Sequence, residues 1–174
     1  MKPIFQVLLL MISWLLVTPV GAQTIEHAPI TFEQAIDANN QGHALAAQNH
    51  FAQAEQLYRT ALSGLQHTHN PRVAINRAAV LNNLGVALVQ QQQSLSALSV
   101  FEEAVSLRAQ HLGNHHALTL LSRHNLAITH LNLQQTQQAC AHMQQVASAR
   151  EQTLGSNHPD AKLSRRILNS IRHC

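Results

Sequence analysis

Thirteen histidines, all C-terminal to residue 22, are the side chains of this sequence best suited to chemistry. Imidazole binds transition metals and exchanges protons near neutral pH, but a helical metal site needs its ligands on one unbroken helix face. His111 and His115 have a suitable spacing, yet Gly113 breaks the helix between them, and His124 and His130 are six residues apart. We therefore expect no specific metal site and interpret the histidines as polar surface residues.

The other reactive side chains do not converge on a catalytic arrangement either. Cys140 and His142 are two residues apart on an expected helix, so their side chains point in different directions. The adjacent Glu102 and Glu103 cannot both face one ligand, and we expect them to be solvated. The sequence contains no glycine-rich phosphate loop and no serine-centred elbow. It predicts a protein without enzymatic activity or cofactor.

The overall charge argues against nucleic acid as a partner. The chain has 11 Lys and Arg against 8 Asp and Glu, which gives no strong positive field. Aromatic residues make up 3% of the chain, too few for the stacking platforms that hold single strands. Nucleic acid is therefore a poor candidate partner.

Residues 1–22 have the layout of a cleaved secretory signal peptide. Lys2 precedes an apolar run over residues 4–17, and small residues lead to a predicted cleavage after Ala22. The apolar run is shorter than the roughly 20 residues that span a bilayer, although an uncleaved membrane anchor is the alternative. We predict a periplasmic or secreted protein with no stable membrane anchor after cleavage. Residues 23–30 form a short polar leader and residues 31–174 one domain.

Both cysteines, Cys140 and Cys174, belong to the part that would be exported, where an oxidising compartment allows pairing. If helices near 136–152 and 158–173 form an antiparallel hairpin, residue 140 lies opposite about residue 171, within one turn of Cys174. We predict a disulfide that holds the last helix. The alternative is two unpaired thiols.

The elements that position these side chains follow an internal repeat of 43 and then 42 residues. In each copy a small residue is followed twelve positions later by Ala, then by a large apolar residue and by a small or apolar one. Small residues allow two helices to cross closely while the remaining apolar face packs alongside. The three copies are Gly42, Ala54, Tyr58 and Ala61; Gly85, Ala97, Phe101 and Ala104; and Ala127, Ala139, Met143 and Val146.

Start and stop signals divide the repeats into helices. Thr31 with Gln34 predicts a capping box, Asn70-Pro71 a second helix start, and Gly113 and Gly155 two helix ends that need a left-handed residue. We predict helices over about 32–48, 51–65, 71–91, 94–111, 117–133, 136–152 and 158–173. The fold class is therefore all-α: a right-handed α-solenoid of about three helix-turn-helix repeats with a C-terminal capping helix.

These motifs resemble the tetratricopeptide repeat family, in the long-period form seen in kinesin light chain. The resemblance covers about residues 32–173, although the first repeat has a shorter turn and lacks the Leu of the Asn-Leu-Gly motif. The residues that carry it are Leu112-Gly113-Asn114-His115-His116-Ala117, Leu154-Gly155-Ser156-Asn157-His158-Pro159, Asn83-Leu84-Gly85 and Asn125-Leu126-Ala127.

The resemblance implies a concave groove, lined by the first helix of each repeat, that binds peptide segments. The Asn side chains either bond to a peptide backbone or tether adjacent repeats, and the apolar ones either line the groove or pack in the core. A charged clamp for terminal carboxylates is not expected there, since only Arg77 and Arg123 are candidates. The groove residues are Asn40, His43, Asn83, Val86, Val89, Asn125, Ile128 and Leu131.

The resulting functional hypothesis is an exported, non-catalytic adaptor or scaffold that binds a peptide segment of another protein. One alternative is a self-assembling structural subunit of an envelope complex, because the sequence leaves the oligomeric state open. Another is a histidine-based metal binder or pH sensor.

Overall fold

The computed structural model of this protein describes residues 30–66, 70–171 and 174. Those ranges contain seven α-helices and no strand. The predicted signal peptide and all of the leader except Ile30 lie outside the described residues. The helices are α1 (Phe32–Ala47), α2 (Phe51–Gly64), α3 (Pro71–Gln90), α4 (Ser94–Leu112), α5 (Ala117–Asn132), α6 (Thr136–Leu154) and α7 (Pro159–Ser170).

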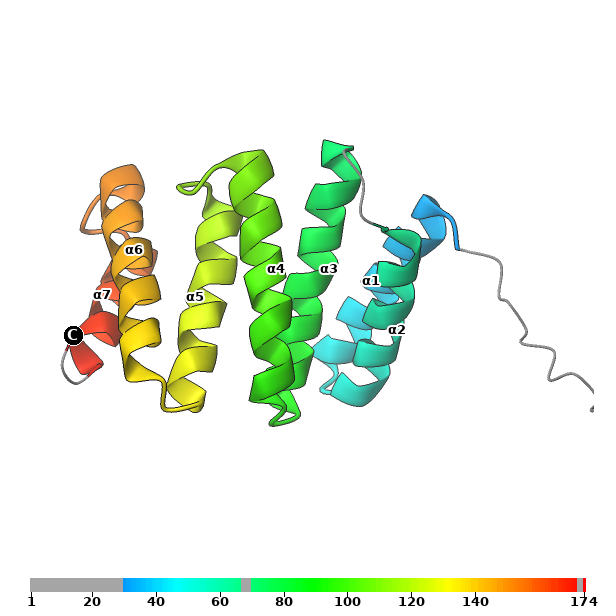
Figure 1. Cartoon of the computed structure of the whole chain (residues 1–174), viewed down its shortest axis with the longest axis horizontal. Helices are drawn as coiled ribbons and strands as arrows, with labels where there is room; N and C mark the ends of the chain where they lie inside the picture. Colours follow the sequence, from blue (N-terminus) through cyan, green and yellow to red (C-terminus); the bar gives the residue numbers. More distant parts are fainter. Residues whose placement is uncertain (1–29, 67–69, 172–173) are drawn as a thin grey trace, which may run out of the picture.

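The helices follow one another in chain order along the long axis of the molecule, with α1 partly behind α2 and α7 partly behind α6, as in an α-solenoid (Figure 1). Each helix packs against the next, so α1 and α2, α3 and α4, and α5 and α6 form three hairpins, and α7 packs on α6. The first helices of neighbouring hairpins also contact one another, α1 with α3 and α3 with α5. In the part of the chain that the structure describes, no helix is both long and apolar enough to cross a membrane.

Local signals set the helix starts as the sequence predicted. Thr31 Oγ1 accepts from Gln34 N–H at 3.2 Å while Gln34 Oε1 accepts from Thr31 N–H at 2.8 Å, which confirms the capping box. The Asn70 side chain caps α3, with Pro71 at the first helical position. Two further caps were not predicted: the Nδ1 atoms of His116 and His158 accept backbone N–H groups at 3.2 Å. The His of each repeated turn is therefore a helix cap.

The close crossings fall where the repeat predicts them. A Cβ atom on Gly42 would lie 2.8 Å from the Tyr58 ring, and one on Gly85 would lie 2.6 Å from the Phe101 ring. In the third hairpin Ala127 and Met143 are both fully buried in one cluster. The two helices of each hairpin therefore meet where a hydrogen atom or a methyl group faces a large side chain.

The turns between hairpins differ from the prediction in one respect. Gly113 and Gly155 have φ of 92° and 84°, but ψ of 158° and 152°, so they are not left-handed helical. This is an extended region that only glycine populates readily. Left-handed residues occur instead inside the hairpins, at Asn49, Gln92 and Gln134.

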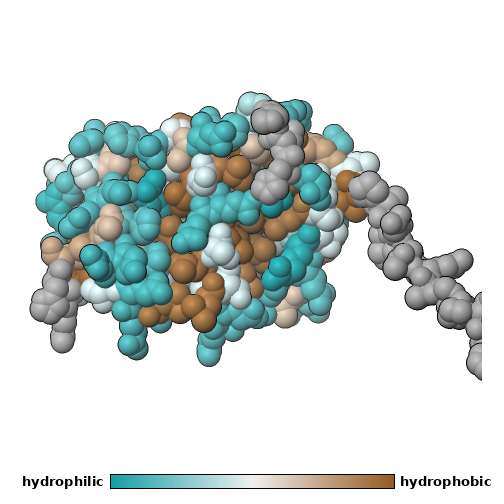
Figure 2. Space-filling view, viewed as in Figure 1, coloured by the Kyte–Doolittle hydropathy of each residue, from teal (hydrophilic) through white to brown (hydrophobic). Residues whose placement is uncertain are grey.

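Figure 2 shows polar side chains over much of the face seen in Figure 1, with apolar residues visible between them near the middle. The buried core is divided into one cluster spanning α1 to α5 and a smaller one around α6 and α7. Ile171 belongs to the second cluster, and Cys140 packs against it. The Cα atoms of Cys140 and Cys174 are 5.6 Å apart, and the two sulfurs are at disulfide distance.

Candidate interaction groove

A cavity of about 250 Å³ lies between α3 and α5, where the first helices of two hairpins approach. Its apolar lining comes from Val86, Val89, Phe101 and Ile128. The polar side chains of Gln90, His124, Asn125 and Thr129 complete the lining. An aliphatic surface with amide groups beside it can hold an apolar side chain and bond to the peptide groups that flank it.

The cavity brings together four of the eight residues predicted for the groove. Val86 is 38% exposed, and Val89 and Ile128 are half-buried, so none of these three is enclosed in the core. Asn125 is the fourth. The other four predicted residues, Asn40, His43, Asn83 and Leu131, do not line this cavity. Asn40 and His43 are exposed on α1, whereas Asn83 and Leu131 are half-buried.

Two of the three aligned asparagines bond to the preceding repeat. Asn83 Nδ2 donates to Asn39 Oδ1 at 3.1 Å, and Asn125 Nδ2 donates to Asn82 Oδ1 at 3.2 Å. These bonds use one donor of each carboxamide. The second N–H and the carbonyl oxygen remain available for a ligand, so tethering and recognition are compatible at these positions.

A buried polar network behind the groove was missed by sequence reasoning. Ser122 Oγ donates to Asn82 Oδ1 at 3.0 Å and accepts from Arg108 Nη1 at 2.7 Å. Arg108 also donates to the Leu118 carbonyl at 2.9 Å, and its burial lowers the pKa of its guanidinium. The network joins α3, α4 and α5 and so fixes the relative position of the two groove helices.

The same anchor recurs one repeat later, where Arg150 Nη1 donates to Ser164 Oγ at 2.8 Å. The signal in the sequence was an Arg and a Ser fourteen residues apart, repeated at the 42-residue period. At the equivalent first interface these positions hold Leu65 and Val80, both buried in the larger core cluster. One interface is thus apolar where the next two are polar.

Three histidines depart from the expectation of surface positions. His130 is 5% exposed and stacks on His142 of α6 with ring centroids 5.4 Å apart. Burial lowers the pKa of His142, and His130 and Arg123 lower it further. Burial also lowers the pKa of His124, with a further lowering by Arg150 and an opposing effect of Asp160. Among the described residues, no group of three or more His, Cys, Asp or Glu could hold a metal ion.

Glu103 is also placed differently from the solvated position expected for it. Its carboxylate accepts from Arg77 Nε at 2.7 Å, and Arg77 donates in addition to the Leu65 carbonyl at 3.0 Å. Arg77 therefore ties α3 to α2 and α4.

The fold agrees with the comparisons to known proteins. The tetratricopeptide repeat family model matches residues 77–118 and 119–160, the second and third hairpin periods. Residues 77–160 therefore form two tetratricopeptide repeats. The match confirms the tetratricopeptide repeats that the sequence predicted. No curated protein matches this chain.

Two solved structures share the fold. One is the crystal structure of kinesin light chain nearly identical TPR-like repeats from Podosopora anserina, with a TM-score of 0.68 and 22% identity over 83% of this chain. A variant of that protein gives a TM-score of 0.65 and 23% identity over 76% of this chain. The present chain spans 66% and 62% of the lengths of those two chains. Repeats of this family indicate a scaffold for protein–protein interactions and are typically non-catalytic.

Proposed function

We propose that the chain is an exported, non-catalytic adaptor whose groove holds a peptide segment of a partner protein. The observation that supports this is the cavity between α3 and α5, with its aliphatic lining and the adjacent Asn125 carboxamide. An extended peptide would place one apolar side chain in the cavity, while side-chain amides bond to its backbone. Such binding would select the peptide by the shape of one apolar side chain and would accept varied residues at its other positions.

Export is supported by two independent features. Residues 1–22 have the layout of a signal peptide. Cys140 and Cys174 stand at disulfide distance, a pairing that persists in oxidising compartments. The proposed location is therefore periplasmic or secreted.

Site-specific photo-crosslinking tests the groove. A photoreactive residue is placed either at Val86, in the cavity, or at Leu95, a matched exposed apolar position outside it that is 73% exposed. The protein is crosslinked in the cells that produce it, and the products are identified by mass spectrometry. We expect a defined product from position 86 that position 95 does not give.

The identity of the product distinguishes the remaining possibilities. A different protein attached at position 86 supports an adaptor, and loss of that product when Ile128, which lines the same cavity, is changed to Asp would place the contact in the groove. A second copy of the chain attached at position 86 would instead support self-assembly. Identical products from both positions would contradict the proposal.

A further inference from the structure

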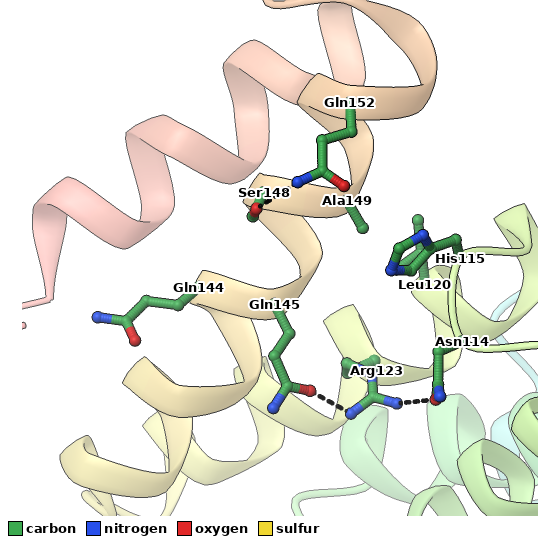
Figure 3. A pocket seen from close by; sticks show the side chains of 9 residues that line it. All are labelled: Asn114, His115, Leu120, Arg123, Gln144, Gln145, Ser148, Ala149 and Gln152. Carbon is green, nitrogen blue, oxygen red and sulfur yellow. Dashed lines mark hydrogen bonds between the residues drawn. The ribbon is translucent and has the colours of Figure 1, made fainter.

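A second, larger cavity of about 730 Å³ lies at the open end of the α5–α6 hairpin, beside the turn that joins α4 to α5 (Figure 3). It shares no lining residue with the groove cavity. The lining is dominated by side-chain amides and hydroxyls rather than by apolar groups. Its polar residues include Asn114, Arg123, Gln144, Gln145, Ser148 and Gln152.

Arg123 brings the only permanent charge to this lining among the described residues. Its Nη2 donates to Asn114 Oδ1 at 3.1 Å, and its Nη1 donates to Gln145 Oε1 (Figure 3). Both acceptors are neutral. Within the described ranges no carboxylate forms an ion pair with Arg123, and its partial burial lowers the pKa of the guanidinium. The cation is thus partly desolvated, and no carboxylate of the described residues compensates it.

The chain contains its own comparison for this arrangement. Arg165 is the residue one 42-residue period after Arg123, and it forms an ion pair with Glu151. The position equivalent to Glu151 in the preceding repeat is Ala109. The interface between α4 and α5 therefore keeps the arginine of this pair, Arg123, and has Ala109 in place of the carboxylate.

We propose that this cavity, which we call the Arg123 pocket, binds a carboxylate group supplied by a ligand. A guanidinium offers two parallel N–H donors that match a carboxylate edge to edge. The Asn114 and Gln145 amides, which now present oxygen to Arg123, present N–H donors to the same anion when they rotate by half a turn. One cation among neutral donors matches a single negative charge better than the double charge of a phosphate. The carboxylate comes either from a small organic acid or from an acidic side chain of a protein segment.

Calorimetric titration of the purified protein tests the pocket with two probes. The first is acetate, and the second is a short peptide with blocked ends and one glutamate; acetamide and the glutamine peptide are the neutral controls. All titrations use matched ionic strength, because screening weakens any exposed charge pair. Binding by acetate indicates a small-acid site, whereas binding only by the glutamate peptide indicates an acidic protein segment.

Three variants assign the binding to Arg123. Arg123→Gln removes the cation, and Ala109→Glu supplies the internal carboxylate that Glu151 supplies to Arg165. We expect each to weaken carboxylate binding by about tenfold or more, the loss of one charge-assisted contact. Arg165→Gln removes the same charge from the paired arginine and should leave binding unchanged. Circular dichroism confirms that each variant is folded.

The proposal is overturned if neither carboxylate probe gives saturable binding to the unmodified protein. It is also overturned if Arg165→Gln weakens binding as much as Arg123→Gln does, because the effect is then one of general charge. Loss of binding in Ala109→Glu with the helical content retained supports it even if Arg123→Gln fails to fold.

Discussion

Gly85 lies against the ring of Phe101, and a Cβ atom at this position would be 2.6 Å from Phe101 Cε1 and Cζ. In the third hairpin the equivalent pair is Ala127 and Met143, both fully buried. An unbranched, flexible methionine leaves room for a methyl group where a rigid ring does not. Each hairpin therefore fits its crossing with a different pair of residues.

This pairing predicts the effect of Gly85→Ala. The added methyl group overpacks the crossing, so we expect the free energy of unfolding to fall by about 1–3 kcal/mol in urea denaturation. Adding Phe101→Met, which reproduces the third hairpin, should restore part of that loss. A double variant less stable than Gly85→Ala by the full cost of a separate Phe101→Met change would show that the two positions are not coupled.

A substitution at Gly113 would change the strain of the backbone without changing side-chain packing. A Cβ atom there would meet nothing within 4 Å, yet its φ of 92° with ψ of 158° is a region that glycine alone populates readily. We expect Gly113→Ala to lower the free energy of unfolding by about 1–3 kcal/mol. Gln92→Gly is the converse control: Gln92 is exposed with a φ of 62°, so glycine there should be neutral or stabilising. If Gly113→Ala were as stable as the unmodified protein, the backbone at this position would not require glycine.

At the scale of elements, the packing of one hairpin on the next rests on a repeated polar anchor. Arg108 reaches from α4 to Ser122 of α5, and Arg150 reaches from α6 to Ser164 of α7. The first interface uses Leu65 and Val80 in the same places. Either an Arg–Ser pair or a Leu–Val pair fits the interface. An arginine that faces valine, by contrast, is buried without the hydroxyl acceptor that serine provides.

A double-mutant cycle at the second interface measures this dependence. Ser122→Val removes the hydroxyl acceptor of Arg108 and leaves it only the Leu118 carbonyl, so we expect the free energy of unfolding to fall by about 1–3 kcal/mol. Adding Arg108→Leu recreates the apolar pair of the first interface and should recover much of that loss. Strictly additive losses in the double variant would contradict a shared anchor. Ser148→Val, at an exposed position of α6, serves as the control.

Helix positions could be predicted from the sequence because their signals are local. The capping box at Thr31 and the cap at Asn70 each depend on residues within four positions of one another. The burial of His130 and Arg108 could not be predicted in this way, since a polar residue becomes a core residue only through partners supplied by another helix. For the groove, the register of the repeats predicted that Val86, Val89, Asn125 and Ile128 share one surface. It could not predict that the cavity forms between α3 and α5, because that depends on how the two helices pack.

For the whole molecule, the half-buried histidines link stability to pH. The pKa of His142 is lowered by burial, His130 and Arg123, and that of His124 by burial and Arg150, with Asp160 opposing. Such a ring binds a proton more weakly in the folded than in the unfolded chain, so stability rises with pH. The stability that these neutral histidines contribute is fully present above the pKa of about 6.5 that they have in the unfolded chain. It is lost as the pH falls from there through their lower pKa in the folded chain.

Urea denaturation at about pH 7.5 and pH 5.5 checks this linkage. We expect a smaller free energy of unfolding at the lower pH. His142→Phe keeps a ring beside His130 but cannot take up a proton, so it should reduce the difference between the two conditions. His43→Phe, at an exposed position on α1, provides the comparison. A pH dependence unchanged by His142→Phe would exclude this histidine as a source.

The difference between the apolar first interface and the two polar interfaces after it also decides how such an array can lengthen. Tandem duplication of the third hairpin would place Arg150 of one copy against Ser122 of the next, a matched junction. Duplication of the second would set Arg108 against Val80, a cation facing a methyl group. The solenoid can therefore lengthen by duplication of its third hairpin but not by duplication of its second. Its repeats share one backbone arrangement, yet their order along the chain cannot be exchanged.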